Sequence, residues 1–294
     1  KMGQQSQTKS FFKGHANDWQ KKAIDDVYST INDRHRAVHR TLSQYPKGAS
    51  ILDVGCGTGQ LAIEAAEKGF NACGVDFAEE MILIANRNAI ESKSDASFEV
   101  GSIFEYKPTT KYDVISALGF IEYISIEQLS EFLEFSYQNL NEGGAISVGS
   151  RNRLFNMTTY NEYTEIEGRL DAIDELITES SIALSSNNTT EFLNKLRSCS
   201  GFSSIVQNET HPITRINVET RFQYTPSDLL HKLERVGFRV TNIYPVNYHA
   251  FNPIIIDDEV TALRKQISEM ISSNFQTDFR FLPNSSSFVM EAKK

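Results

Sequence analysis

The sequence has few of the features that mark secreted, metal-binding or membrane proteins. It contains only three cysteines in 294 residues, Cys56, Cys73 and Cys199, without C-x-x-C spacing. That pattern indicates neither a disulfide framework nor a zinc site, and no metal is expected. No apolar run approaches the roughly 20 residues that a membrane-spanning helix needs. The first residues also lack the apolar core of a signal peptide. These absences predict a cytoplasmic protein with no membrane partner.

Positive charge is also scarce. The chain has 29 lysine and arginine residues against 38 aspartate and glutamate residues, a formal net charge of -9. A broad nucleic-acid surface needs an excess of positive charge, so no nucleic-acid partner is expected. The basic segment 34–40 falls on a predicted helix and is interpreted as a solvated face, with a local basic patch as the alternative.

The strongest positive signal is the glycine-rich turn Ile51-Leu-Asp-Val-Gly-Cys-Gly-Thr-Gly59, between a short apolar strand and a helical pattern. A backbone that turns sharply there and lies against a ligand has no room for a Cβ and favours positive φ. The turn therefore predicts a nucleotide-type cofactor site. Its spacing is G-x-G-x-G, preceded by Asp53, whereas a dinucleotide fold has G-x-G-x-x-G.

Strand and helix patterns alternate around this turn. Helices are predicted over 60–68, 78–90 and 126–140, and strands over 70–76, 96–101, 112–118 and 145–149, the last after a turn at 141–144. Strands separated by helices of this length form parallel sheets with right-handed crossovers. With 40% hydrophobic residues, the chain can bury the core of one large domain, or of a domain with an insertion.

The sheet pattern pauses between Arg151 and Tyr224. Helical stretches are predicted over 167–179 and 192–197, with a polar mobile loop over 178–190. Because this segment follows the carboxyl end of a strand, where ligands bind in open α/β sheets, it is interpreted as a substrate lid. The pattern resumes with a helix from Pro226 to Gly237, a strand over 238–246, a helix over 257–273 and a last strand over 286–292.

The glycine turn, together with Asp76 seventeen positions after Gly59, resembles the motifs of the class I S-adenosylmethionine-dependent methyltransferases. The Gly237-Phe238 pair before a sixth strand extends the resemblance. It implies an α/β fold with a doubly wound, seven-stranded, mostly parallel sheet, an antiparallel last strand and an inserted helical lid. The implied parts are an N-terminal helical cap (1–44), the cofactor-binding core (45–150), the lid (151–224) and the completion of the sheet (225–294).

The resemblance implies S-adenosyl-L-methionine as cofactor, S-adenosyl-L-homocysteine as product and no metal. Asp76 would accept hydrogen bonds from both ribose hydroxyls, since a carboxylate has two acceptor oxygens; the alternative is a helix cap near Ala78. Ser102 stands where the family often has an aspartate facing adenine. Trp19 is either a hydrophobic anchor or an aromatic wall. The expected cofactor-binding residues are Asp53, Gly55, Cys56, Gly57, Gly59, Asp76, Phe77, Met81, Ser102, Ile103, Leu118, Gly119 and Trp19.

Acceptor recognition is predicted mainly in segment 150–163, which is dense in the arginine, asparagine and tyrosine side chains that bind hydroxyls, carboxylates and phosphates. The expected acceptor-binding residues are Phe120, Arg151, Asn152, Arg153, Asn156, Tyr160, Tyr163, Arg221 and Tyr224. A hydroxyl acceptor also needs a base. His249 is the first candidate, with a loop or capping role as the alternative. The others are Glu122, Tyr123, which replaces the histidine of a Glu-His pair common in relatives, and His15.

The resulting prediction is a methyltransferase for a small polar acceptor, acting most readily at oxygen, with a sugar or nucleotide-linked sugar as a candidate. N-methylation of a small amine and a non-catalytic S-adenosylmethionine-binding scaffold stay open. The G-x-G-x-G spacing disfavours an oxidoreductase. A homodimer is left open.

Overall fold

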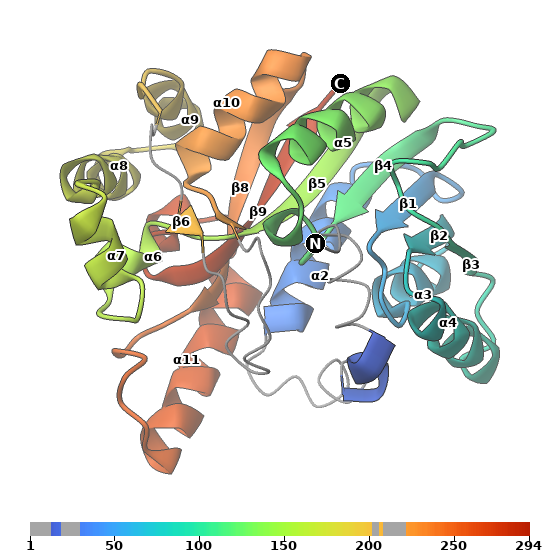
Figure 1. Cartoon of the computed structure of the whole chain (residues 1–294), viewed down its shortest axis with the longest axis horizontal. Helices are drawn as coiled ribbons and strands as arrows, with labels where there is room; N and C mark the ends of the chain where they lie inside the picture. The colour runs from blue at the N-terminus through green and yellow to red at the C-terminus, as the bar shows by residue number, and fades with distance from the viewer. Residues whose placement is uncertain (1–12, 19–29, 202–205, 208–221) are drawn as a thin grey trace, which may run out of the picture.

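The structure is a computed structural model that describes residues 13–18, 30–201, 206–207 and 222–294. Its centre is a seven-stranded sheet with the order β3-β2-β1-β4-β5-β9-β8 (Figure 1). The strands are β1 (Ser50–Val54), β2 (Asn71–Asp76), β3 (Ser97–Val100), β4 (Tyr112–Ala117), β5 (Leu140–Arg151), β8 (Arg239–Tyr248) and β9 (Ser285–Lys293). Only β9 runs antiparallel to its neighbours. The predicted doubly wound sheet with an antiparallel last strand is confirmed.

Helices cover both faces of the sheet. One layer contains α2 (Thr30–Leu42), α3 (Gln60–Glu67), α4 (Glu79–Glu91) and α11 (Asp258–Phe275). The other contains α5 (Ile126–Asn139) and α10 (Pro226–Val236), which lie in front of the sheet in Figure 1. Pro226 occupies the first turn of α10, and Gly237 caps its end with a φ of 120°, as the sequence predicts.

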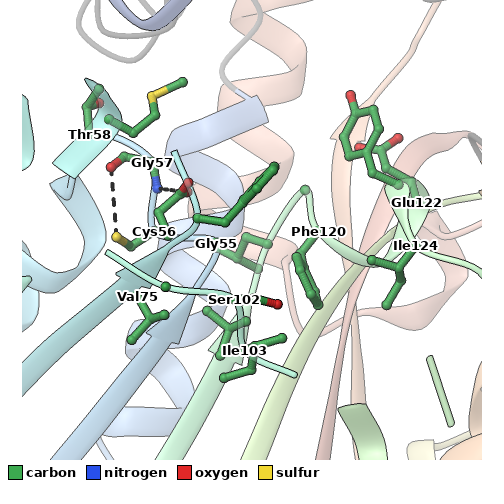
Figure 2. A pocket seen from close by; sticks show the side chains of 18 of the residues that line it. Gly55, Cys56, Gly57, Thr58, Val75, Ser102, Ile103, Phe120, Glu122 and Ile124 are labelled. Atoms are coloured by element: carbon green, nitrogen blue, oxygen red, sulfur yellow. Dashed lines mark hydrogen bonds between the residues drawn. The ribbon is translucent and has the colours of Figure 1, made fainter. Parts of the chain in front are cut away.

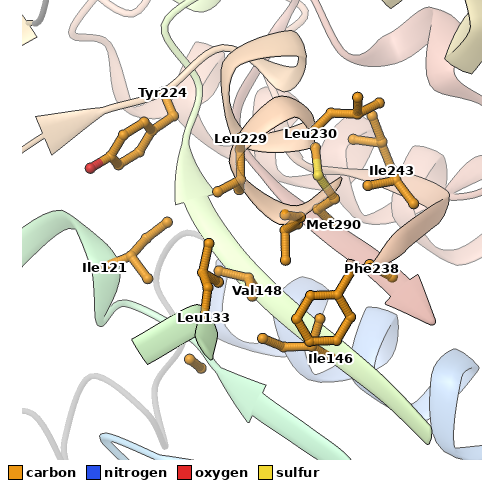
Figure 3. Packing of buried hydrophobic residues seen from close by; sticks show 14 of the residues in the cluster. Ile121, Leu133, Ile146, Val148, Tyr224, Leu229, Leu230, Phe238, Ile243 and Met290 are labelled. Carbon is orange, nitrogen blue, oxygen red and sulfur yellow. The ribbon is translucent and has the colours of Figure 1, made fainter. Parts of the chain in front are cut away.

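The apolar strands are buried on both faces. Leu52 packs into the large cluster beneath α5 and α10, where Ile146, Val148 and Met290 meet helix leucines (Figure 3). The neighbouring Ile51 points the other way, into the cluster beneath α2 and α3. Because successive side chains of a strand alternate between faces, an unbroken apolar strand serves both layers.

A buried carboxylate joins α2 to the antiparallel end of the sheet. Glu291 of β9 is fully buried. It accepts hydrogen bonds from Thr41 (2.6 Å), Gln44 (2.9 Å), Thr241 (2.6 Å), Asn242 (2.9 Å) and Tyr244 (3.2 Å). Burial alone would raise the pKa of Glu291, but these hydrogen bonds outweigh it and hold the pKa below its usual range. The charge therefore fixes where α2 lies on the sheet.

The insertion after β5 is more ordered than predicted. It forms α6 (Phe155–Thr158), α7 (Thr164–Arg169), α8 (Ile173–Ser185), α9 (Thr189–Arg197) and a ribbon of β6 (Val206–Gln207) and β7 (Phe222–Gln223). The expected loop over 178–190 is wrong. Glu179 of α8 accepts bonds from the Ser227 amide (2.7 Å) and hydroxyl (2.6 Å) at the start of α10. Asn188 caps α9. The buried Glu179 contact and the Asn188 cap therefore order this segment despite its polar composition.

The predicted turn at 141–144 lies within β5 as a bulge, because the pairing with β4 passes from Leu140–Tyr112 to Ala145–Val114 and Gly143 has a φ of 74°. A second local prediction needs correction. The basic segment 34–40 is not a solvated face. Its arginines Arg36 and Arg40 donate to Ser272 (2.7 Å) and Gln276 (3.0 Å) of the α11 region.

None of the helices in the described ranges is long and apolar enough to cross a membrane.

Replacement of Gly59 by alanine is expected to destabilise the fold. Gly59 has a φ of +87°, and a Cβ there would lie 2.6 Å from Phe98 Cζ and 2.9 Å from Ala85 Cβ. Gly59→Ala should lower the free energy of unfolding by about 2–5 kcal/mol, from left-handed strain plus overpacking. In Gly48→Ala, the control, φ is +86° but a Cβ meets no atom of the described residues within 4 Å. It should lose only about 1–2 kcal/mol. Equal losses in urea denaturation would contradict the packing role.

Candidate cofactor and acceptor site

A cavity opens at the carboxyl ends of β1, β2 and β4 (Figure 2). The chain passes from β1 to β2 on one side and places β4 on the other, so β1 marks the point where the strand order reverses. Ligands of open α/β sheets bind at such points. The glycine turn forms one wall, and the segment after β4 forms another. The fold therefore puts a cavity where the sequence predicts a cofactor.

The glycine turn is held by backbone bonds and by one carboxylate. The amides of Gly55 and Cys56 donate to the Val75 carbonyl at 2.8 and 3.2 Å. Gly55 and Gly57 have φ angles of 66° and 55°. A Cβ on Gly55 would lie 3.3 Å from Phe120 Cδ2. The turn thus needs glycine at position 55 both for conformation and for space.

Asp76 lies at the end of β2 and joins the two neighbouring loops. Its Oδ2 accepts from the Gly57 amide at 3.0 Å, and its Oδ1 accepts from the Ala78 amide at 2.9 Å. The N-cap of α4 is Ala78, so Asp76 is not itself the capping residue. Burial raises the pKa of Asp76 to about 6 despite both bonds. Each oxygen keeps a further lone pair for a ligand at the cavity wall.

Three predicted cofactor residues support the turn in different ways. Asp53 is buried, does not line the cavity and accepts from the Ser116 hydroxyl at 2.8 Å. Gly59 packs against Phe98 and also lies off the cavity. Cys56 lines the cavity, and burial raises the pKa of its thiol, so the sulfur stays protonated.

The other predicted cofactor residues in the described part of the chain line the cavity. They are Gly55, Gly57, Asp76, Phe77, Met81, Ser102, Ile103, Leu118 and Gly119. The Ser102 hydroxyl accepts from the Phe104 amide at 3.4 Å. Trp19 lies outside the described residues.

Helix α2 brings two basic side chains to the cavity that the sequence reasoning missed. Arg34 and His35 line it. His35 Nδ1 lies 2.9 Å from one oxygen of Glu64, and His39 Nε2 lies 2.8 Å from the other. Burial raises the pKa of Glu64, but the two imidazoles outweigh it and lower that pKa to about 2. The i, i+4 spacing of His35 and His39 was the available signal, since it places both on one helix face.

Three of the predicted acceptor or catalytic residues face the opposite part of the cavity. Phe120, Glu122 and Tyr123 line it, and Figure 2 shows Phe120 between the glycine turn and Glu122. Arg151 Nε donates to Glu122 Oε2 at 2.6 Å. Burial raises the pKa of Tyr123 well above its usual range, so its phenol is neutral at physiological pH. Phe120 packs edge-on against Phe132 at 5.2 Å.

The polar residues after Arg151 mostly bind one another instead of the cavity. Arg153 is buried and donates to both oxygens of Glu167, at 2.9 and 3.1 Å from Nε. Asn156 donates to Glu167 at 2.9 Å and to Gln223 at 2.7 Å. Asn152 donates to the Leu282 and Ser285 carbonyls. A buried arginine requires such a partner, so these contacts are structural.

Several further predicted residues also lie away from the cavity. Tyr163 and Tyr224 are buried elsewhere. His15 sits in a helical stretch over 13–18 without lining it. His249 and Tyr160 line a second cavity. Arg221 lies outside the described residues. Within the described ranges, no group of three or more His, Cys, Asp or Glu side chains is placed to hold a metal ion.

Comparison with known proteins also relates the core of the sheet to methyltransferases. Residues 51–144 match a family model described as a methyltransferase domain. A ubiquinone biosynthesis O-methyltransferase of Rickettsia canadensis is 32% identical over 104 residues, 35% of this chain and 43% of that protein. One of the same name from Paramagnetospirillum magneticum is 27% identical over 124 residues, 41% and 49% of the two chains. The match thus spans less than half the length of these relatives.

Solved structures extend the likeness to the whole fold. A magnesium protoporphyrin IX methyltransferase from Synechocystis PCC 6803 aligns over 99% of both chains, with a TM-score of 0.59 and 14% identity. A 1,6-didemethyltoxoflavin-N1-methyltransferase from Burkholderia thailandensis aligns over 98% of this chain and 88% of its own, with a TM-score of 0.58 and 12% identity. At these identities the likeness establishes the fold alone.

A seven-stranded sheet of this order, with a glycine turn at its switch point and an acid after the second strand, defines a class I, Rossmann-like methyltransferase fold. Residues 51–144 thus match a methyltransferase domain, and the chain has the class I methyltransferase fold around them.

The buried Asp53 should make stability depend on pH. Burial raises its pKa from 3.8 to about 7, so its stabilising protonated form is lost as the pH rises through 7. Asp53→Asn removes this titration and keeps an oxygen for Ser116. The free energy of unfolding of the variant, relative to that of the wild type, should increase as the pH rises from about 4 to 7, by up to about 1.4 kcal/mol per pH unit. Urea denaturation across this range measures the difference, and a constant offset would count against the raised pKa.

Proposed function

We propose that this chain binds S-adenosyl-L-methionine in the cavity at the ends of β1, β2 and β4 and transfers its methyl group to a hydroxyl of a small polar acceptor. The observation that carries the proposal is the pair of bonds from Gly57 and Ala78 to Asp76 at the switch point of the sheet. They hold a two-oxygen acceptor beside the glycine turn, where a ribose diol can donate to both oxygens.

The remaining walls suit the other parts of this cofactor. Ile103 and Met81 offer apolar surface near the Asp76 end, which suits the adenine ring. Arg34 and His35 supply basic groups at the wall built by α2, which suits the carboxylate of the methionine part. We therefore propose that the cofactor runs from β2 across the glycine turn toward α2.

The acceptor would enter from the side of Glu122. Its carboxylate lines the cavity and is oriented by Arg151 at 2.6 Å. Phe120 and the neutral Tyr123 line the same part of the cavity, where their rings would shield the reacting atoms from water. A substrate hydroxyl placed there can donate to Glu122, whereas Arg153 and Asn156 are engaged with Glu167.

The bound cofactor supplies a methyl group activated by a positive sulfur, and the protein supplies position and a proton acceptor. Glu122 would take the hydroxyl proton as the C–O bond forms and the C–S bond breaks, leaving the electron pair on sulfur. We assign this role to Glu122 because His249 does not line the cavity. The O-methyltransferase names of the relatives support oxygen as the acceptor atom. A sugar is one such acceptor.

Calorimetry with S-adenosyl-L-homocysteine, S-adenosyl-L-methionine and NAD tests the cofactor. The first two should bind and NAD should not. Asp76→Ala should weaken S-adenosyl-L-homocysteine binding at least tenfold, because two ribose hydrogen bonds are lost. Asp76→Asn keeps one carbonyl oxygen and should lose less of this affinity. Asp95→Ala, at an exposed position, should bind S-adenosyl-L-homocysteine as tightly as the wild type. Preferred binding of NAD, or full affinity in a folded Asp76→Ala, would refute the cofactor assignment.

The role of Glu122 is tested separately from cofactor binding. An acceptor is first found by incubating the protein and labelled methyl donor with cell extract. Glu122→Gln should then reduce turnover about 10²-fold or more, the range typical of a lost general base. Its affinity for S-adenosyl-L-homocysteine should stay within about twofold. Glu127→Gln, on an exposed turn of α5, is the matched control. Unchanged turnover in Glu122→Gln would remove it from the mechanism.

A further inference from the structure

A second cavity lies between the start of the insertion and the turn that follows β8. It is lined by residues 157–160, Thr164, residues 249–252 and Asn284, and has a volume of about 400 Å³. It shares no lining residue with the cofactor cavity. That volume accommodates one small ring-sized ligand.

The imidazole of His249 is the least satisfied group in this cavity. Neither ring nitrogen has a hydrogen-bond partner within the described part of the chain, although both atoms are buried. The ring packs on Phe155, with centroids 4.8 Å apart. Burial, and then the charge of Arg264, lower the pKa of His249 to about 4. The ring is therefore neutral at physiological pH and offers one donor and one acceptor. Buried groups left without partners are unfavourable, and they point to a ligand.

Other groups around His249 offer the same mixture of donors and acceptors. The side-chain amide of Asn284 makes no hydrogen bond among the described residues, and Asn252 uses only its Oδ1, which accepts from Ile254 at 3.0 Å. The hydroxyls of Thr159 and Thr164 donate to backbone carbonyls at 2.7 and 2.8 Å. Both oxygens also accept from Asn161, at 3.2 and 3.0 Å, so the two threonines shape the wall and the unpaired groups are those of His249 and Asn284.

The lining carries no ionised side chain. It consists of threonine, asparagine, tyrosine, methionine, alanine, phenylalanine and the neutral histidine. Arg264, whose charge lowers the pKa of His249, is not among the lining residues. A charged ligand would lose its hydration there without gaining a counter-ion. Tyr160 is 52% exposed and presents an aromatic ring at this cavity.

We propose that this cavity binds a neutral, hydroxyl-rich ring, such as a monosaccharide unit, with His249 and Asn284 as its hydrogen-bonding centre and Tyr160 against its face. Each hydroxyl of such a ring both donates and accepts, which matches the unpaired groups of His249 and Asn284. An aromatic ring covers the C–H face of the sugar. The site does not depend on the cofactor or on methyl transfer.

The test uses methyl β-D-glucopyranoside as the neutral probe, with glucuronate and glucosamine as charged counterparts. Titrations of the full chain are followed by the imidazole NMR signals of His249. The neutral probe should bind saturably and shift those signals, and both charged probes should bind at least fivefold more weakly. His249→Phe keeps a ring on Phe155 and should weaken binding at least tenfold. His231→Phe, the same substitution on α10, should not change it.

Three results would overturn the proposal. They are the absence of any His249 shift at high millimolar probe, unchanged binding in His249→Phe, and tighter binding of glucuronate, which would assign the site to the charge of Arg264. If His249→Phe does not fold, Asn284→Ala and Tyr160→Ala replace it, each with an expected loss of at least threefold. Affinity for S-adenosyl-L-homocysteine should stay unchanged in every variant, so failure here leaves the cofactor assignment intact.

Discussion

The bond from the Gly57 amide to Asp76 is the contact on which the cavity depends, because it ties the turn after β1 to the end of β2. Neither strand alone determines where its loop goes. Gly55 and Gly57 adopt left-handed conformations. The Asp76 carboxylate, at the end of the neighbouring strand, accepts a hydrogen bond from the Gly57 amide. Parallel pairing of β1 with β2 fixes that meeting. The same contact explains why an acidic side chain is kept in a position where burial raises its pKa.

The other walls are assembled from distant parts of the chain. Arg34 and His35 reach the cavity because α2 lies across the sheet, and α2 lies there because Thr41 and Gln44 donate to Glu291 of β9. A residue near the C-terminus therefore positions side chains near the N-terminus. Glu64 acts similarly on α3, where one carboxylate orients two imidazoles of α2. These two carboxylates thus fix α2 in place, Glu291 against the sheet and Glu64 against the neighbouring helix α3.

The sequence predicted the features that are encoded locally. Gly55 and Gly57 follow from a turn whose conformation allows few alternatives, and Asp76 follows from its spacing after that turn. The alternation of strand and helix patterns predicted the parallel sheet. Arg34 and His35 were missed because their role depends on how α2 packs, which no local pattern reports. Arg153 and Asn156 were predicted to face a ligand because polar density does not reveal whether side chains bind a ligand or one another. In the structure they bind Glu167. The segment 178–190 was misjudged for a related reason, since the contact from Glu179 to Ser227 lies 48 residues away.

That contact bears on how the insertion could be moved to another protein of this fold. Here Arg153, Glu167, Asn156 and Gln223 all lie within the insertion, whereas the buried Glu179 accepts from the Ser227 amide and hydroxyl at the start of α10. A chimera that carried the insertion without the start of α10 would leave the Glu179 carboxylate buried without its hydroxyl donor. The transferable module is therefore the insertion together with the first turn of α10.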